Sequence, residues 1–169
     1  MKRVYTKIGD VFSVKIDEST KKYFQLIAYD LQMLNSDVIR AFEKKYPMNE
    51  TPPLSEIING EVEFYAHCVT KWGVKLGYWE KIGSNPDVGQ LDHILFRETS
   101  DWGPVPATPE TVYISEKWYV WRINDDDFTD VGKLEGENRN AEIGPVMPPK
   151  SIVERMQTGK YYGYYPSFE

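Results

Sequence analysis

The hydrophobic pattern that organises the chain is an alternation over residues 61–69. Hydrophobic side chains fall at every second position from Val62 to Cys68, which is the period of a half-buried strand. The alternation resumes over residues 74–82, after a short gap that contains Gly73. Two alternating runs with a glycine-containing gap between them are typical of a β-hairpin. We therefore predict that these two runs pair as the central hairpin of the fold.

Further strand patterns lie on both sides of this stretch. Residues 11–16 alternate and residues 23–29 are rich in aromatic and β-branched side chains, so we predict an antiparallel pair. The apolar run at residues 94–96 predicts another strand. Residues 112–123 also favour strand, and the polar residues 115–117 predict a tight turn that divides them into two strands.

Other segments interrupt the strands. Residues 36–46 fit helical spacing and also a short strand, and we favour the strand. Residues 54–58 follow two prolines and predict one or two helical turns. A helix with an apolar stripe is predicted to be opened by Pro148 and Pro149 and to be capped by Gly159. Residues 99–111, with three prolines, predict a connecting arm.

These elements predict a mostly β fold of the α+β class. We expect an antiparallel, strongly twisted sheet or a partly open barrel, with one C-terminal helix and short helical turns. The hydrophobic fraction of 41% and the 7 Phe, 5 Trp and 12 Tyr exclude intrinsic disorder and favour strands. With 169 residues, the chain is expected to form a single domain over residues 1–169.

Charge and composition narrow the classes of partner. The formal net charge of −6 argues against a nucleic-acid partner, which would require a surplus of lysine and arginine, and suits a basic partner. The alternative is that moderate negative charge serves solubility alone. The basic start of the chain is followed by no apolar signal segment, and no stretch is long enough to span a membrane. We therefore expect a cytoplasmic protein with no membrane partner.

The chain carries little that predicts catalysis. His67, His93 and Asp92 could belong to a hydrolase site together with a serine or Cys68, but no nucleophile motif surrounds them. Cys68 falls on the inward face of its strand and is predicted to be buried. The sequence lacks the spaced cysteine and histidine motifs of metal sites and the glycine-rich loops of phosphate sites. We therefore expect a protein that is not an enzyme and needs no cofactor and no metal.

Several segments together resemble a known family. They are residues 7–12, residues 62–67, the Gly77-Tyr78-Trp79 and Ile82-Gly83 pieces, and residues 118–123. In these segments the chain is similar to the family of bacterial immunity proteins numbered twenty-six in polymorphic toxin systems. The resemblance implies a mostly β, non-enzymatic protein of the cytoplasm. Such a protein binds and neutralises a cognate toxin, often a nuclease, as its partner.

The residues suited to a toxin partner are acidic or aromatic. Acidic side chains speed association with a basic protein, and buried aromatic rings supply durable affinity. The candidates for partner binding are Asp125, Asp126, Asp127 and Asp130 as steering charges, and Trp102, Trp121, Tyr161 and Tyr162 as aromatic anchors. The ordinary interpretation of each is a solvated loop or the core. A competing hypothesis is a carbohydrate- or peptide-binding module with a platform of Trp72, Trp79 and Trp102.

Overall fold

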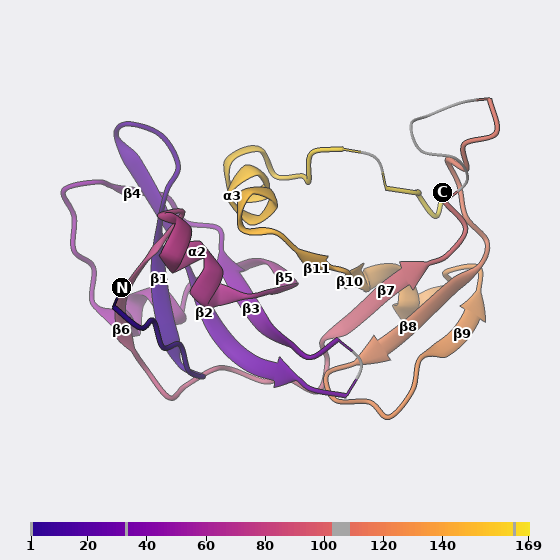
Figure 1. The fold of residues 1–169 in the computed structure, drawn as a ribbon, viewed down its shortest axis with the longest axis horizontal. Coiled ribbons are helices and arrows are strands. Elements are labelled where there is room, and N and C mark those ends of the chain that lie inside the picture. The colour runs from indigo at the N-terminus through magenta and orange to yellow at the C-terminus, as the bar shows by residue number, and fades with distance from the viewer. Residues whose placement is uncertain (1, 33, 103–108, 164) are drawn as a thin grey trace.

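The computed structural model describes residues 2–32, 34–102, 109–163 and 165–169, in which the strands form two mixed sheets along the long axis (Figure 1). In sheet A the strand order is β11-β5-β3-β2-β1-β6, and β4 pairs with β2. Its strands are β1 (Asp10–Lys15), β2 (Thr20–Asp30), β3 (Ser36–Phe42), β4 (Tyr46–Pro47), β5 (Val62–Cys68), β6 (Glu80–Ser84) and β11 (Val146–Met147). Sheet B has the order β10-β7-β8-β9, with β7 (Leu95–Thr99), β8 (Trp118–Arg122), β9 (Thr129–Gly132) and β10 (Glu142–Ile143).

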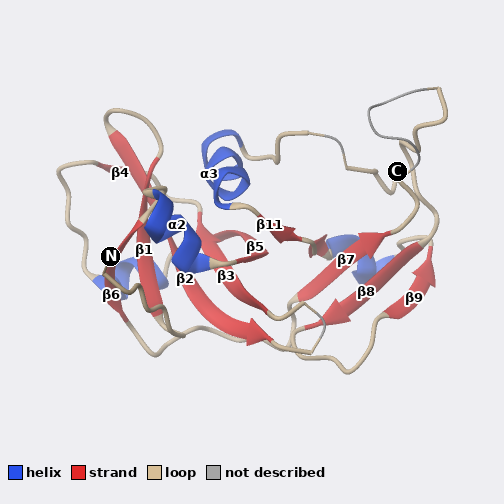
Figure 2. Cartoon of the chain, viewed as in Figure 1, coloured by secondary structure: helices blue, strands red, loops and turns tan. Residues whose placement is uncertain are grey.

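Short helices connect the strands, as Figure 2 shows. They are α1 (Leu54–Ile58), α2 (Thr70–Leu76), the 3₁₀ helix η1 (Gly136–Asn140) and the C-terminal helix α3 (Pro149–Thr158). The mostly β fold with one C-terminal helix is confirmed. The expectation of one antiparallel sheet or barrel needs correction, because there are two sheets in the described residues and they do not close into a barrel. Each also gains a parallel edge strand, β11 on β5 and β10 on β7.

Most of the predicted strands are present. β1 and β2 pair antiparallel, with Phe12 opposite Phe24, as their patterns indicate. Residues 36–42 form the favoured strand, β3, and it lies between β2 and β5. The predicted turns of α1 and the start of α3 at Pro149 are also confirmed, and α3 ends at Gly159 in the left-handed conformation.

The predicted central hairpin is wrong. β5 pairs with β3 and β11, whereas β6 pairs with β1 at the opposite edge of sheet A. The segment after β5 forms helix α2, which ends at Gly77 with a left-handed φ of 79°. Trp79 decides this geometry, because its Nε1 donates to the carbonyl of Thr70 at 2.9 Å and its ring lies so close to Gly73 that no side chain fits there. Burial of one large ring therefore outweighs the local alternation.

The predicted strand over residues 112–114 is also absent. Ile114 forms only an isolated bridge with Ser167. Strand β8 follows it in the chain, but both edges of β8 are already occupied by β7 and β9, so no edge remains there for another strand. Of the predicted connecting arm, residues 103–108 lie outside the described residues, as does Tyr164 in the tail.

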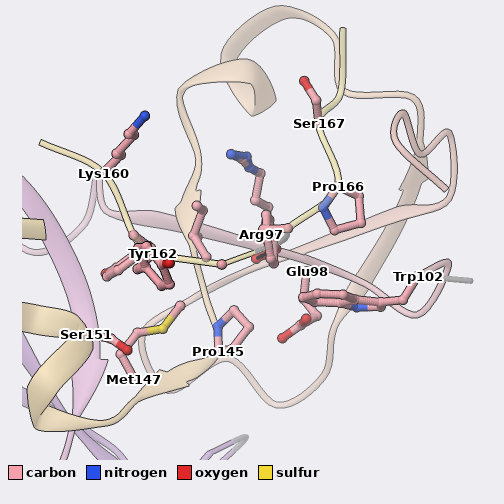
Figure 3. A pocket seen from close by; sticks show the side chains of 14 residues that line it. Arg97, Glu98, Trp102, Pro145, Met147, Ser151, Lys160, Tyr162, Pro166 and Ser167 are labelled. Atoms are coloured by element: carbon pink, nitrogen blue, oxygen red, sulfur yellow. Dashed lines mark hydrogen bonds between the residues drawn. The ribbon is translucent and has the colours of Figure 1, made fainter. Parts of the chain in front are cut away.

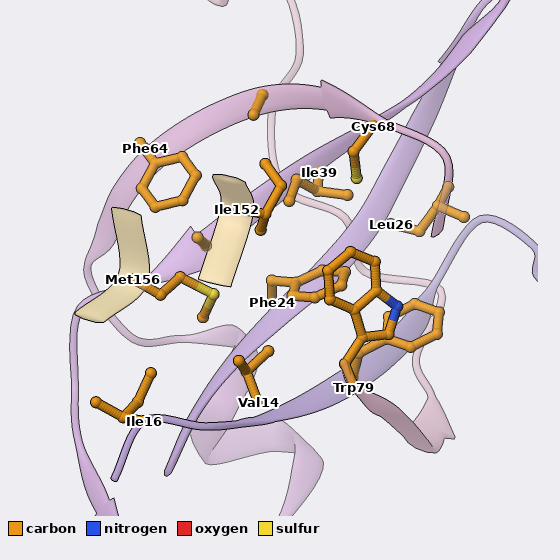
Figure 4. Packing of buried hydrophobic residues seen from close by; sticks show 13 residues of the cluster. Val14, Ile16, Phe24, Leu26, Ile39, Phe64, Cys68, Trp79, Ile152 and Met156 are labelled. Atoms are coloured by element: carbon orange, nitrogen blue, oxygen red, sulfur yellow. The ribbon is translucent and has the colours of Figure 1, made fainter. Parts of the chain in front are cut away.

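The main core lies between sheet A and helix α3 (Figure 4). Ile152 and Met156 of α3 are buried against the inward side chains of β1, β2, β3 and β5. Phe24 stacks on Phe12 with ring centroids 5.0 Å apart and meets Trp79 edge to face at 4.9 Å. Cys68 is buried in this cluster, as predicted, and burial raises the pKa of its thiol well above the ordinary value.

The two sheets are joined by a buried polar cluster centred on Asp30, the last residue of β2. The carboxylate of Asp30 accepts hydrogen bonds from His67 Nε2 at 2.8 Å and from Trp121 Nε1 at 3.1 Å. It also accepts the backbone N–H of Asn124 at 3.1 Å. Burial alone would raise the pKa of Asp30, but the hydrogen bond from His67, with those from Asn124 and Trp121, lowers it below the ordinary value. Asp30 thus connects two strands of sheet A with β8 of sheet B.

The position of Asp30 predicts a large effect of its removal. Asp30→Ala is expected to lower the free energy of unfolding by about 3–5 kcal/mol, because it leaves buried donors on His67 and Trp121 without an acceptor. Urea denaturation followed by tryptophan fluorescence measures this loss. The control is Asp126→Ala at an exposed position, which should change stability by no more than about 0.5 kcal/mol. Equal effects of the two substitutions would contradict this role of Asp30.

Candidate functional site

A cavity of about 530 Å³ lies where sheet B, helix α3 and the C-terminal tail meet (Figure 3). Glu98 at the end of β7 and Trp102 shortly after it form one side of the cavity, while Pro145 and Met147 lie across from them. Residues 160–163 and 165–167 complete its rim. The volume lies within the range of pockets that bind small molecules or single side chains of a partner.

The cavity exists because strand β10 is short. β10 pairs with Phe96 and Arg97 of β7, and the N–H of Gly144 then donates to the carbonyl of Arg97 at 2.8 Å. Gly144 approaches the ring of Trp121 too closely for any side chain. From Pro145 onward the chain leaves sheet B and joins β5 of sheet A as β11. The edge of β7 at Glu98 is therefore uncovered on this side.

Glu98 is an ionisable group of the cavity with a strongly shifted pKa. Burial raises the pKa of its carboxyl to about 7 from the ordinary value of 4.5. Its cross-strand neighbour is Tyr119 of β8. Within the described part of the chain, no hydrogen bond or ion pair reaches the Glu98 side chain. A half-buried carboxylate without a partner is energetically costly in the ionised form, which makes Glu98 a candidate for contact with a ligand.

Aromatic rings surround Glu98. The ring of Trp102 meets that of Tyr165 edge to face with centroids 5.1 Å apart, and its Nε1 donates to the carbonyl of Thr99 at 2.7 Å. The pKa of Tyr165 is raised by burial and further by the charge of Glu98. Tyr162 stands at the rim and is 88% exposed. The cavity therefore combines fixed aromatic walls with one freely accessible ring.

The basic side chains near the cavity differ in their contacts, and Nε and Nη1 of Arg97 are buried without a hydrogen-bond acceptor. The guanidinium of Arg97 lies over the rings of Trp118 and Phe168, at 5.2 and 4.9 Å from their centroids. That of Arg155 contacts the Glu142 carboxylate at 3.4 Å. Burial raises the pKa of Glu142, and the attraction of Arg155 opposes this shift. Lys160 is exposed and points away from Glu98 in Figure 3.

Three of the predicted anchors meet at this cavity, because Trp102, Tyr161 and Tyr162 all line it. Burial raises the pKa of Tyr161 to about 12. Trp121 does not join them, since it is only 1% exposed and donates to Asp30 in the core. Trp121 is therefore not available as a surface anchor. The spacing of its strand places it on the buried face of sheet B, where it packs against Phe96.

The predicted acidic residues lie elsewhere. Asp125, Asp126 and Asp127 are on the loop between β8 and β9, and Asp130 is in β9 opposite Tyr119. Asp126, Asp127 and Asp130 are exposed, and Asp125 is half-buried with its carboxylate accepting the N–H of Arg122 at 2.7 Å. This loop follows the last residue of β8, whereas the tail beside the cavity contacts Trp118, the first residue of β8. Asp125, Asp126 and Asp127 are thus at the opposite end of β8 from the cavity, whereas Asp130 lies across from Tyr119, the cross-strand neighbour of Glu98.

The competing sites do not assemble as expected. Trp79 is buried at 4% exposure whereas Trp72 is 49% exposed on α2, so these rings and Trp102 form no common platform. The ring of His67 is fully buried and bonded to Asp30, while His93 contacts the hydroxyl of Tyr65 at 3.3 Å. The proposed grouping of both histidines with Asp92 is therefore not observed.

Two further searches of the described residues gave no site. No group of three or more histidine, cysteine, aspartate or glutamate side chains is placed to hold a metal ion in the described part of the chain. No helix in the same residues is long and apolar enough to cross a membrane.

Glu98 was not identified from the sequence. The only local signal is that two charged residues, Arg97 and Glu98, directly follow the apolar run at residues 94–96. In an alternating strand one of these two faces the core side. The sequence does not show which of the two faces the core, or whether a basic side chain lies beside it. Both depend on segments more than forty residues away, such as residues 142–147.

The raised pKa of Glu98 predicts a pH dependence of stability. The folded state binds a proton on Glu98 more tightly than the unfolded state, so stability should fall as pH rises from the ordinary value of 4.5 to about 7. In Glu98→Gln this component is absent. Urea denaturation between about pH 4.5 and about pH 8 should therefore show a smaller loss of stability in the variant than in the native chain. Parallel pH profiles would contradict the raised pKa.

Comparisons with known proteins add no relative. The chain matches no family model, no curated protein and no solved structure. None of these comparisons identifies the immunity protein family, and the resemblance stays an expectation from the sequence segments named above.

Proposed function

We propose that this chain is an immunity protein that binds a cognate bacterial toxin in the cytoplasm and neutralises it by steric and electrostatic blocking. The observation that carries the proposal is the convergence of Trp102, Tyr161 and Tyr162 at one cavity of an acidic protein. Aromatic side chains in a pocket are typical energetic centres of protein interfaces. The net charge of −6 favours a basic partner, such as a nuclease toxin with a cationic groove.

The exposed acidic loop supports the same proposal in a different way. Asp126 and Asp127 on this loop and Asp130 in β9 carry three exposed negative charges. Charges of this kind act at a distance and raise the rate of encounter, while contributing little to the lifetime of the complex. Contacts in the aromatic cavity would slow dissociation and so lengthen the lifetime of the complex. Asp126 and Asp127 follow the last residue of β8 while Asp130 pairs with Tyr119 near the cavity, so a partner that meets all three charges and the cavity covers the length of the strand.

A second candidate function is a carbohydrate- or peptide-binding module. The observation that favours it is the same cavity, whose volume of about 530 Å³ and aromatic walls also suit a sugar ring. The two functions differ in their partner. An immunity protein forms a stable complex with one folded protein. A carbohydrate- or peptide-binding module binds free oligosaccharides or peptides and needs no folded protein partner.

Co-expression distinguishes them. The product of a toxin-bearing reading frame beside the gene should arrest growth when expressed alone, and this chain should restore growth and co-purify with it in a fixed ratio. Growth arrest that persists at equal expression, with no co-purification, would contradict the immunity function. The substitution Tyr162→Ala removes the exposed rim ring and should shorten the lifetime of the complex by about tenfold or more.

Neutralising the acidic loop predicts an effect on the association rate. The triple variant Asp126→Asn, Asp127→Asn and Asp130→Asn should slow association with the toxin by about tenfold at low salt, and the difference should shrink as salt is added. Stopped-flow measurement over a range of ionic strength tests this. The control removes the same charge from exposed positions of sheet A and its connections, with Glu43, Glu50 and Glu61 changed to Gln. Equal rates for both variants would contradict steering by the loop.

A further inference from the structure

Glu98 is a carboxylate that the protein itself leaves without a counter-ion. Arg97 precedes it in β7 and also lines the cavity, but its guanidinium extends away from Glu98 in Figure 3 and lies over the rings of Trp118 and Phe168. Arg155 is paired with Glu142. In the described residues no ion pair joins either guanidinium group to Glu98, although Nε and Nη1 of Arg97 are buried without a hydrogen-bond acceptor. The Glu98 carboxylate therefore lies in the cavity with no cation paired to it.

Lys160 is the remaining basic side chain at the rim. Figure 3 shows it on the far side of the cavity, extended away from Glu98. It begins the tail that continues through Tyr161 and Tyr162, so its backbone is tied to the rim and not to the floor of the cavity. A cation that neutralises Glu98 must therefore come from outside the chain.

The surroundings of Glu98 suit an organic cation better than a metal ion. Figure 3 shows the Glu98 side chain beside the ring of Trp102, and Pro145 also lines the cavity. Tyr165 lies against Trp102 at 5.1 Å. The faces of such rings attract ammonium and guanidinium groups, and the attraction grows when water is displaced. A metal ion would need several oxygen ligands, and Glu98 belongs to no such group among the described residues.

From this geometry we propose that the cavity receives a lysine or arginine side chain of a partner protein, with the Glu98 carboxylate as counter-ion and the rings of Trp102 and Tyr165 as walls. This deepens the proposed function, since a basic toxin supplies such side chains, but the preference of the cavity for a cation holds or fails by itself. The cavity of about 530 Å³ accommodates one long side chain together with part of its backbone. The negative net charge of the chain favours the approach of that partner.

The proposal predicts binding of small cationic peptides. Blocked tripeptides Gly-Arg-Gly and Gly-Lys-Gly are titrated into the full chain at low salt and about pH 8, where Glu98 is ionised, and the indole N–H signal of Trp102 is followed by NMR. We expect dissociation constants on the order of 1 mM for both peptides. The tripeptide Gly-citrulline-Gly has nearly the shape of the arginine peptide but no charge, and should bind about tenfold more weakly.

Matched variants assign the binding to Glu98. Glu98→Gln keeps the shape of the side chain and should weaken the arginine peptide about tenfold, whereas Glu43→Gln, which removes the same charge from an exposed position, should leave its affinity unchanged. Lowering the pH through about 7 should weaken binding in the native chain only, because Tyr119 and Tyr165, which face Glu98, have raised pKa values and stay neutral. The variant should show no such step.

Three outcomes would overturn the proposal. They are equal affinity for the arginine and citrulline peptides, an unchanged affinity in Glu98→Gln, and no shift of the Trp102 signal with either basic peptide. Failure of the proposed function is recognised separately. Peptide binding without rescue of growth would support the cation site and contradict the immunity function. Rescue of growth by a chain that binds no basic peptide would support the immunity function and contradict the cation site.

Discussion

The fold depends on one buried carboxylate that serves two sheets. Asp30 ends the longest strand of sheet A and accepts hydrogen bonds from His67 in the same sheet and from Trp121 in sheet B. An ionised group in such a position is tolerated only when its oxygens are fully used by donors. Because those donors come from β5, β8 and the backbone after β8, the cluster fixes how sheet B sits against sheet A. Apolar packing of Ile27, Phe96 and Trp121 then closes the same junction.

The cavity is a consequence of this junction. One continuous segment, residues 142–147, pairs first with β7 of sheet B and then with β5 of sheet A. Since the two sheets are held at a fixed distance, the segment must leave β7 before that strand ends. The carboxylate of Glu98 is thereby left at an uncovered edge, in a cavity that Trp102 and the aromatic tail help to line. The path of residues 142–147 between the two sheets therefore both joins the sheets and forms the Glu98 cavity.

Charge is distributed in two ways that serve different purposes in binding. The acidic loop after β8 is solvated, so its charges are screened and cost little, and they influence approach more than affinity. Glu98 is half-buried among rings, where ionisation without a partner is costly and a correctly placed cation would be strongly favoured. The same negative sign thus gives long-range attraction at one end of β8 and local selectivity at the other.

The sequence by itself determined the elements whose pattern and end signals agree. These include β1 with β2, the strands β3, β5, β7 and β8, the short helix α1, and α3 with its proline start and glycine end. Tertiary structure decided the rest. Helix α2 exists because Trp79 packs over Gly73, which local alternation cannot reveal. Trp102, Tyr161 and Tyr162 were identifiable as aromatic candidates, but Trp121 entered the core and Glu98 became a site only because distant segments meet there. Periodicity records which face of a strand is buried, whereas the partner on that face is set by contacts far along the chain.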